Sequence, residues 1–349
     1  MKAKRFFVIF TLNLCLIVSS ICIAQSAGPE RYWISFTQAV PDNPGAPGPV
    51  GPKNLMLIDS IGNVLIPSQK VVPQSVVRTN FHAPTALRRS GGRLTMWTVN
   101  RNETIIRVKI DKKSLKVISV QNIGIVVGNS MRLQVSQRDI DNFLVTDLAS
   151  QLGVTPTGFH LNDKGAFTGE MTSLFRSEFD CFDGFDCGPS VSSDGKMAIL
   201  GYKENKIATL LLQPLTSSGS PKRGSVVVLS GGKGLRAASL DITNPMSGSR
   251  FLVYVEAKFG AHQTLYLQVV SANTGTLIGS RIQIANGLAT AGQSVAIDPL
   301  GRFVLYTVSN FPLIGTQLMF QALDATGHPS GNPKQIASKV DSGVDILKE

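Results

Sequence analysis

The sequence predicts an all-β protein built from six similar units of about 50 residues. Helical periodicity is almost absent, short β-branched and aromatic runs recur, and the turns between these runs keep a regular spacing. The runs, which are bounded by Gly, Asp, Asn or Ser, read RYWISF, NLMLID, RLTMWTV, IIRVKI, NFLVTD, KMAILGY, ATLLLQPL, SVVVLS, RFLVYVE, TLYLQVV, RFVLYTV and QLMFQAL.

Two independent series of turns define the units. The first follows the third strand of each unit and reads DSIG, DKKS, NDKG, TSSG, ANTG and DATG, ending at Gly62, Ser114, Gly165, Gly219, Gly275 and Gly327. The second precedes the second strand and reads SGGR, SDGK, SGSR and PLGR, ending at Arg93, Lys196, Arg250 and Arg302, with a degenerate member near Asn142. Asp or Asn with Gly supplies the positive φ that such turns need. Both series therefore indicate one repeat of roughly constant length.

A unit of this length with four short strands is typical of a WD40-like repeat, the blade of a β-propeller. The sequence therefore predicts a six-bladed β-propeller with four antiparallel strands per blade. The expected blades are 31–72, 84–125, 131–175, 188–230, 236–286 and 292–339. No strand precedes RYWISF, so we expect the C-terminal strand 342–349 to complete the first blade and close the ring, which removes exposed sheet edges. One domain then covers residues 28–349.

The N-terminus has the pattern of a secretory signal peptide. Lys2, Lys4 and Arg5 precede an uncharged apolar run from Phe6 to Ile23, and small residues follow up to Ala27. We expect residues 1–27 to be removed and the chain to be secreted or periplasmic. The alternative is an uncleaved anchor, because about 18 apolar residues just span a bilayer; this would be the chain's one contact with a membrane.

The net charge limits the classes of binding partner, and the cysteines indicate a disulfide. The net charge of +11 falls to about +8 without the signal, and the basic residues are scattered rather than clustered. This favours a cationic solvated surface, with an acidic surface or a glycan as a neighbour, over nucleic-acid binding. The mature chain keeps Cys181 and Cys187, which we expect to form a disulfide in an oxidising compartment.

The stretch FDCFDGFDC at 179–187 repeats a Phe-Asp triplet. A period of three does not fit a strand and favours a tight 3₁₀-like turn pinned by the two cysteines. Calcium is a weaker hypothesis: Asp180, Asp183 and Asp186 could supply oxygen ligands, but the spacing of a calcium loop is missing. The stretch could also form a lip that contacts a ligand, or a plain turn with its Phe rings packed beneath it.

No catalytic motif appears, so the sequence predicts no catalytic residue and no cofactor. The four histidines lack zinc spacing, and neither a G-x-S-x-G elbow nor a phosphate loop is present. Loops on a rigid scaffold are the usual binding regions. We therefore expect a binding face where the loops between blades meet the loops joining second and third strands. It gathers the Pro-Gly segment 40–53 and Arg78, His82, Arg101, Lys203, Lys233, Arg236, Lys258, His262, Phe311, Phe182 and Asp183.

The segments VSSDGKMAILGY (191–202) and AIDPLGRFVLYTV (296–308) resemble the repeats of TolB-like and lactonase-like bacterial propellers. The resemblance implies the propeller fold. Our first functional hypothesis is a monomeric module of the cell envelope or periplasm that binds a protein or a small ligand. The alternative is a lactonase-like or glycan-processing hydrolase with its site at the channel mouth.

Overall fold

The computed structural model describes the strands of the chain and most of their turns. The described residues are 29–39, 50–73, 75–76, 85–90, 92–100, 102, 104–126, 133–137, 142–150, 153–162, 166–175, 190–204, 207–222, 224, 226–233, 235–258, 263–288, 294–309 and 316–349. They contain strands and turns but no helix, so the all-β prediction is confirmed. The chain divides into Met1–Glu30 and Arg31–Glu349, and every strand among the described residues belongs to the second unit.

The strands described in this unit form six four-stranded sheets, numbered here in chain order. Sheet 1 has the order β24 (Val340–Lys348), β1 (Arg31–Ala39), β2 (Val50–Asp59) and β3 (Val64–Val72). Sheet 2 holds β4 (Thr85–Ser90), β5 (Arg93–Val99), β6 (Thr104–Asp111) and β7 (Val117–Val126). Sheet 3 holds β8 (Leu133–Gln137), β9 (Asn142–Ser150), β10 (Gly153–Leu161) and β11 (Phe167–Ser173).

The C-terminal half continues the same pattern. Sheet 4 holds β12 (Ser190–Val191), β13 (Met197–Glu204), β14 (Ile207–Pro214) and β15 (Val226–Lys233). Sheet 5 holds β16 (Leu235–Ile242), β17 (Ser249–Lys258), β18 (Gln263–Ser271) and β19 (Leu277–Leu288). Sheet 6 holds β20 (Val295–Ile297), β21 (Phe303–Ser309), β22 (Thr316–Leu323) and β23 (Pro329–Ser338).

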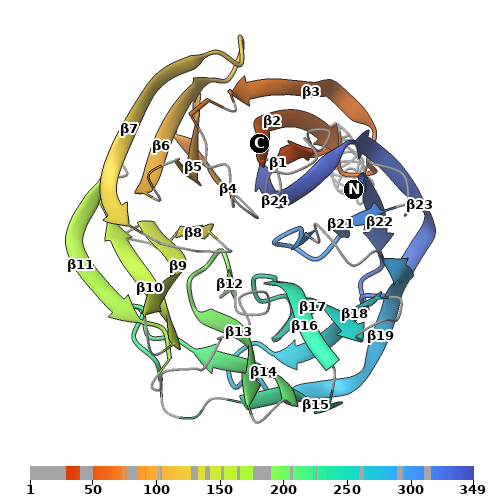
Figure 1. Cartoon of the computed structure of the whole chain (residues 1–349). Helices are drawn as coiled ribbons and strands as arrows, with labels where there is room; N and C mark the ends of the chain where they lie inside the picture. Colours follow the sequence, from red (N-terminus) through yellow and green to blue (C-terminus); the bar gives the residue numbers. More distant parts are fainter. Residues whose placement is uncertain are drawn as a thin grey trace, which may run out of the picture. The chain divides into compact units, whose positions relative to one another are not determined.

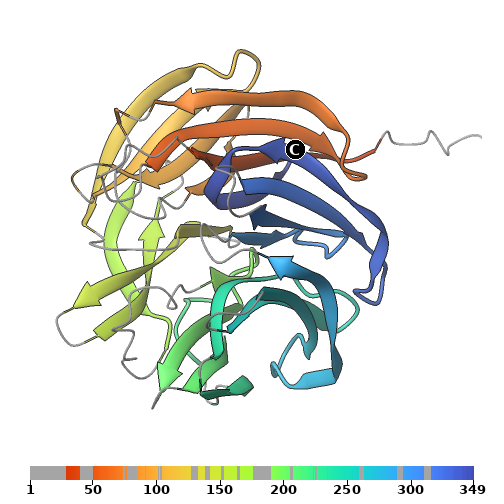
Figure 2. The same ribbon diagram turned by 45° about the vertical axis from the view of Figure 1, so that its right-hand side comes forward.

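The sheets follow one another around a common centre, as Figure 1 and Figure 2 show. The innermost strands β24, β4, β8, β12, β16 and β20 contact one another in cyclic order. The last strand, β24, pairs antiparallel with the first, β1, with Ile346 opposite Ile34. This is the arrangement of a β-propeller, so the predicted propeller fold is confirmed.

Separate apolar cores fill the spaces between neighbouring sheets. Tyr32, Ile34 and Phe36 of β1 pack against sheet 6, where Phe303 and Phe320 lie. The intervening residue Trp33 points the other way and packs with sheet 2. Because β1 is covered on both faces, its sequence is almost continuously apolar instead of alternating with polar residues. This explains runs such as RYWISF.

The turns between the third and fourth strands of the sheets share two features. These are hydrogen bonds from backbone N–H groups to an Asp side chain and a residue with positive φ. Asp59, Asp111 and Asp324 each accept hydrogen bonds from backbone N–H groups two to four residues later. Gly62 and Gly327 take the positive φ. In the turn after Asp111, however, which has no glycine, Leu115 takes it at 54°. The expectation that Gly supplies this conformation is therefore wrong for that turn.

Gly62 also meets a packing constraint from the neighbouring sheet. A Cβ at this position would lie 2.7 Å from the Phe320 ring of sheet 6. Gly279 has a positive φ as well, 65°, but has nothing within 4 Å of its Cβ position.

We expect Gly62→Ala to lower the free energy of unfolding by roughly 2–4 kcal/mol, from backbone strain of about 1 kcal/mol plus overpacking. The matched variant Gly279→Ala should cost only the strain, about 1 kcal/mol. Urea unfolding of both measures the difference. Equal losses would contradict the role assigned to the Phe320 contact.

The signal-peptide and anchor predictions concern residues 1–27, which lie outside the described residues. Among the residues that are described, no helix is long and apolar enough to cross a membrane.

Candidate functional site

Most of the residues predicted from sequence to form a site lie outside the described part of the chain. These are residues 40–49, Arg78, His82, Arg101, Cys181, Cys187, Phe182, His262, Phe311 and the calcium candidates Asp180, Asp183 and Asp186. In the described part, His, Cys, Asp and Glu form no group of three that could hold a metal ion.

The backbone does place four of the predicted binding residues. Lys203 lies near the end of β13, opposite Ala208, and Lys233 ends β15 opposite Ile207. Arg236 lies near the start of β16 and Lys258 at the end of β17, so both are at the same end of sheet 5 along the strand direction. Because only residue 234 separates β15 from β16, all four positions belong to one rim of the ring.

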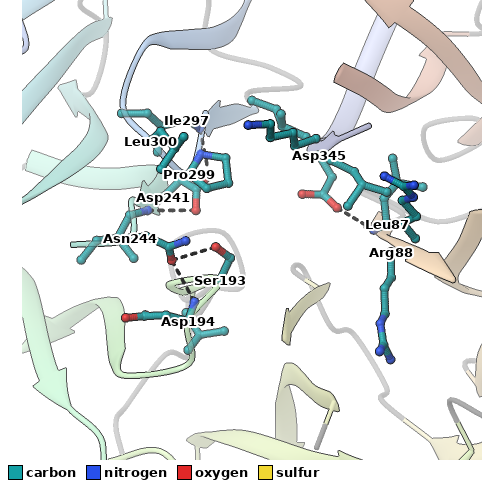
Figure 3. Close-up of a pocket in the computed structure, with 16 residues that line it drawn as sticks. Leu87, Arg88, Ser193, Asp194, Asp241, Asn244, Ile297, Pro299, Leu300 and Asp345 are labelled. Carbon is teal, nitrogen blue, oxygen red and sulfur yellow. Dashed lines mark hydrogen bonds between the residues drawn. The ribbon is translucent and has the colours of Figure 1, made fainter. Parts of the chain in front are cut away.

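A pocket of about 770 Å³ lies at the other ends of the innermost strands. Its walls come from β4, the end of β16, β20 and β24, and from the turns that follow β12, β16 and β20 (Figure 3). On β16 the pocket residue Asp241 is five residues from Arg236, which is roughly 16 Å along a strand. The pocket is therefore built by a different set of turns from those expected to bind.

Two aspartates in the pocket wall join neighbouring sheets. Asp241 of β16 accepts the backbone N–H of Ile297 in β20 at 2.9 Å and the hydroxyl of Ser190 in β12 at 3.0 Å. Asp345 of β24 accepts the backbone N–H of Leu87 in β4 at 2.6 Å (Figure 3). Both carboxylates satisfy an N–H on an innermost strand that has a sheet neighbour on one side only.

A third carboxylate, Asp194, is held by an ion pair between sheets 4 and 5. Its oxygens accept two hydrogen bonds from Arg250, at 2.8 and 3.1 Å, and the Arg250 side chain is 1% exposed. Burial by itself raises the pKa of Asp194, but the hydrogen bonds from Arg250 and Ser192 outweigh it and hold that pKa below its ordinary value. Asp194 is thus a structural anion at the pocket edge.

Asn244 connects three sheets at the same edge. Its Oδ1 accepts from the Ser193 hydroxyl and from the Asp194 backbone N–H, both at 2.8 Å. Its own backbone N–H donates to the Pro299 carbonyl at 2.9 Å. Because the Asp194 N–H can only donate, the side-chain oxygen of Asn244 must face it, which turns the Nδ2 donor away.

Cationic side chains line the side of the pocket opposite Asn244. Arg88 and Arg89 come from β4, and Lys348 comes from the end of β24. Arg89 is exposed, and within the described part of the chain neither its guanidinium nor Asn244 Nδ2 has a hydrogen-bond or ion-pair partner. The pocket therefore combines carboxylates that hold its walls with two donors, Arg89 and Asn244 Nδ2, that are unpaired in the described part of the chain.

A polar cluster around the buried Asp298 adjoins the lining residue Pro299. Asp298, 1% exposed, accepts from Arg302 Nε at 2.8 Å, and Arg302 also donates to the Tyr32 hydroxyl of sheet 1. Burial raises the pKa of Asp298 to about 6, although backbone N–H groups of Arg302 and Leu300 and the charge of Lys348 act in the opposite direction. Burial and the nearby Asp298 also raise the pKa of Tyr32.

The pocket itself was missed by sequence reasoning, although one signal for it exists. The triplets Leu240-Asp241-Ile242 and Val344-Asp345-Ile346 lie in the second halves of two innermost strands. An aspartate between two buried apolar residues is costly unless it is hydrogen-bonded. The recurrence of this pattern could have indicated the links between sheets.

The raised pKa of Asp298 gives a pH dependence with a definite sign. The native carboxyl titrates near pH 6 and the unfolded one near its ordinary value of 3.8, so the native state binds more protons between these values. The contribution of Asp298 to stability is therefore most favourable below about pH 4 and declines as the pH rises through 6. We expect Asp298→Asn to remove this decline.

The measurement is the free energy of unfolding of both proteins between pH 4 and 7. The wild type should lose stability relative to Asp298→Asn as the pH rises across this range. Parallel pH profiles would contradict the assignment, whatever the constant offset caused by the lost contact with Arg302.

Comparisons with known proteins identify the fold. No protein-family model matches the chain, and no curated protein matches it. Similar solved structures include AofleA from Arthrobotrys oligospora, with a TM-score of 0.56 and 9% identity over 86% of this chain and 84% of that one. TolB from Acinetobacter baumannii has a TM-score of 0.50 and 11% identity over 90% and 67%. The periplasmic gluconolactonase PpgL from Pseudomonas aeruginosa has a TM-score of 0.49 and 13% identity over 91% and 99%.

The TM-scores of AofleA and TolB show similarity of fold. The predicted resemblance to TolB-like propellers is confirmed at the level of the fold.

Proposed function

We propose that the chain is an exported β-propeller that acts as a ligand-binding module of the cell envelope or periplasm. The ligand occupies the pocket at the ends of β4, β16, β20 and β24. Its volume of about 770 Å³ lies within the range of about 300–1,000 Å³ that is usual for small-molecule sites.

One observation carries this proposal: the carboxylates of the pocket support its walls. Asp241 and Asp345 accept backbone N–H groups of adjacent strands, and Asp194 is paired with a buried arginine. A general acid or base exchanges a proton with the substrate, and protonating one of these carboxylates would weaken the contact that holds its wall. The arrangement favours a pre-formed wall that binds a ligand over a set of groups that transfer protons.

We further infer that each of the six sheets is one blade and that β24 closes the ring. Two facts support this: the cyclic contacts of the innermost strands and the pairing of β24 with β1. Because β24 fills the innermost place of sheet 1, no strand of a second copy is needed there, so we propose a monomer. We also propose that no cofactor is bound.

Export rests on the signal-like N-terminus. N-terminal sequencing of the exported chain tests cleavage near residue 27. In the same setting we propose the Cys181–Cys187 disulfide; two reactive thiols in the unfolded, unreduced chain would exclude it. The rim that carries Lys203, Lys233, Arg236 and Lys258 is proposed as a second contact surface for a protein.

The pocket proposal is tested by blocking the site. Leu300 lines the pocket and is 43% exposed, whereas Leu277 is 46% exposed on the outermost strand β19. Saturation-transfer NMR with a panel of sugars, sugar lactones and small organic acids measures binding, and the same spectra followed over hours measure turnover. We expect at least one reversible ligand whose signal is lost in Leu300→Trp and kept in Leu277→Trp.

Two results would contradict the proposal. Steady conversion of a lactone or an oligosaccharide would favour the alternative, a lactonase-like or glycan-processing hydrolase. Binding that is unaffected by Leu300→Trp would place the site elsewhere on the molecule.

A further inference from the structure

We infer that the pocket is selective for an anionic ligand whose carboxylate or phosphate oxygens accept hydrogen bonds from Asn244 and Arg89. This inference rests on the binding function proposed above and names the chemical class of the ligand. It follows from which donors and acceptors of the pocket are already engaged.

The three carboxylates of the wall are engaged in structural contacts. Asp241 accepts three hydrogen bonds, from Ser190, Ile242 and Ile297. Asp194 accepts two hydrogen bonds from Arg250, and one oxygen of Asp345 accepts the Leu87 N–H. A ligand rich in donors would have to compete with these bonds, and an unmade bond to a buried charged group is costly.

The Asn244 amide is a donor with a fixed direction. Its Oδ1 is held by the Ser193 hydroxyl and the Asp194 N–H, so rotation of the amide would place an NH₂ group against a backbone donor. The remaining Nδ2 belongs to a residue that lines the pocket and has no partner in the described part of the chain. A pre-oriented donor of this kind favours an acceptor on the ligand.

Across the pocket from this donor lie three cationic residues and Asp345, whose carboxylate is engaged by the Leu87 N–H. Arg89 is exposed to the pocket without an ion-pair partner among the described residues, and Arg88 and Lys348 add positive charge on adjoining strands. Arginine binds planar oxyanions through two parallel hydrogen bonds, which are stronger than bonds between neutral groups. Pro299 and Leu300 supply apolar surface in the pocket lining, which suits the carbon skeleton of a small organic anion.

The test compares three molecules of equal length that differ in charge: adipate, adipamide and 1,6-diaminohexane. Each is titrated into the full-length protein while the Asn244 side-chain amide and the Arg89 Nε–H are followed by ¹⁵N NMR. We expect adipate to shift both signals saturably, with a dissociation constant at least tenfold lower than that of adipamide, and diaminohexane to leave both unchanged.

Two variants separate the contributions. Asn244→Asp keeps an oxygen for the Ser193 and Asp194 bonds but replaces the free donor by a negative oxygen, and Arg89→Gln removes one charge. Each should weaken adipate binding roughly tenfold or more, the loss expected for a charge-assisted hydrogen bond. Lys70→Gln, an exposed position on the outermost strand β3, should leave adipate binding unchanged.

The outcomes distinguish this inference from the function it rests on. If adipamide or diaminohexane binds as well as adipate, and Leu300→Trp blocks that binding, the anion selectivity is wrong while the binding site stands. If adipate binds equally to the wild type and to both variants, the donors are misassigned. If none of the three binds and no panel ligand is sensitive to Leu300→Trp, both proposals fail.

Discussion

The inner ends of sheets 4, 5, 6, 1 and 2 are linked by hydrogen bonds between neighbouring innermost strands. Each innermost strand has a sheet partner on one edge only, so N–H groups on its other edge need acceptors. Asp241 and Asp345 provide them for Ile297 and Leu87, and Ser294 provides one for Val344 at 3.0 Å. With the bond from Ser190 to Asp241, these contacts connect sheets 4, 5, 6, 1 and 2 in succession.

The same contacts determine the character of the pocket. A carboxylate that accepts an N–H of an adjacent strand is fixed in position and uses part of its acceptor capacity, which favours ligand groups that accept hydrogen bonds. The Asn244 amide shows the same division. Its oxygen accepts hydrogen bonds from the Ser193 and Asp194 turn, and its nitrogen stays available to a ligand in the pocket. Structural bonds and ligand selectivity are therefore two consequences of one arrangement.

The architecture could be predicted because it is encoded locally. Turn residues such as Asp59 and Gly62 carry their own hydrogen bonds and backbone conformation, so their spacing indicates the repeat. The turn from Asp111 to Leu115 shows the limit of this logic: it has no glycine, and the buried Leu115, one residue after the expected glycine position, takes the positive φ.

The pocket could not be predicted in the same way because it is assembled across the ring. Leu87, Asn244, Leu300 and Asp345 come from four different sheets, and no spacing in the sequence brings them together. Charge is a poor guide as well. Lys203 and Arg236 are basic residues next to loops, but their charge does not show at which end of the innermost strands a pocket forms. The repeated Asp in Leu240-Asp241-Ile242 and Val344-Asp345-Ile346 is the usable signal.

The central claim, that wall carboxylates hold the inner strands, is tested most directly by amide hydrogen exchange at Leu87. Its N–H donates to Asp345, so in the wild type it should exchange slowly although β4 is an innermost strand. In Asp345→Ala the Leu87 amide should exchange at least tenfold faster, while the control Asp324→Ala, in an exposed turn, should leave it unchanged. A Leu87 amide that exchanges rapidly in the wild type, or at the same rate in Asp345→Ala, would contradict the account.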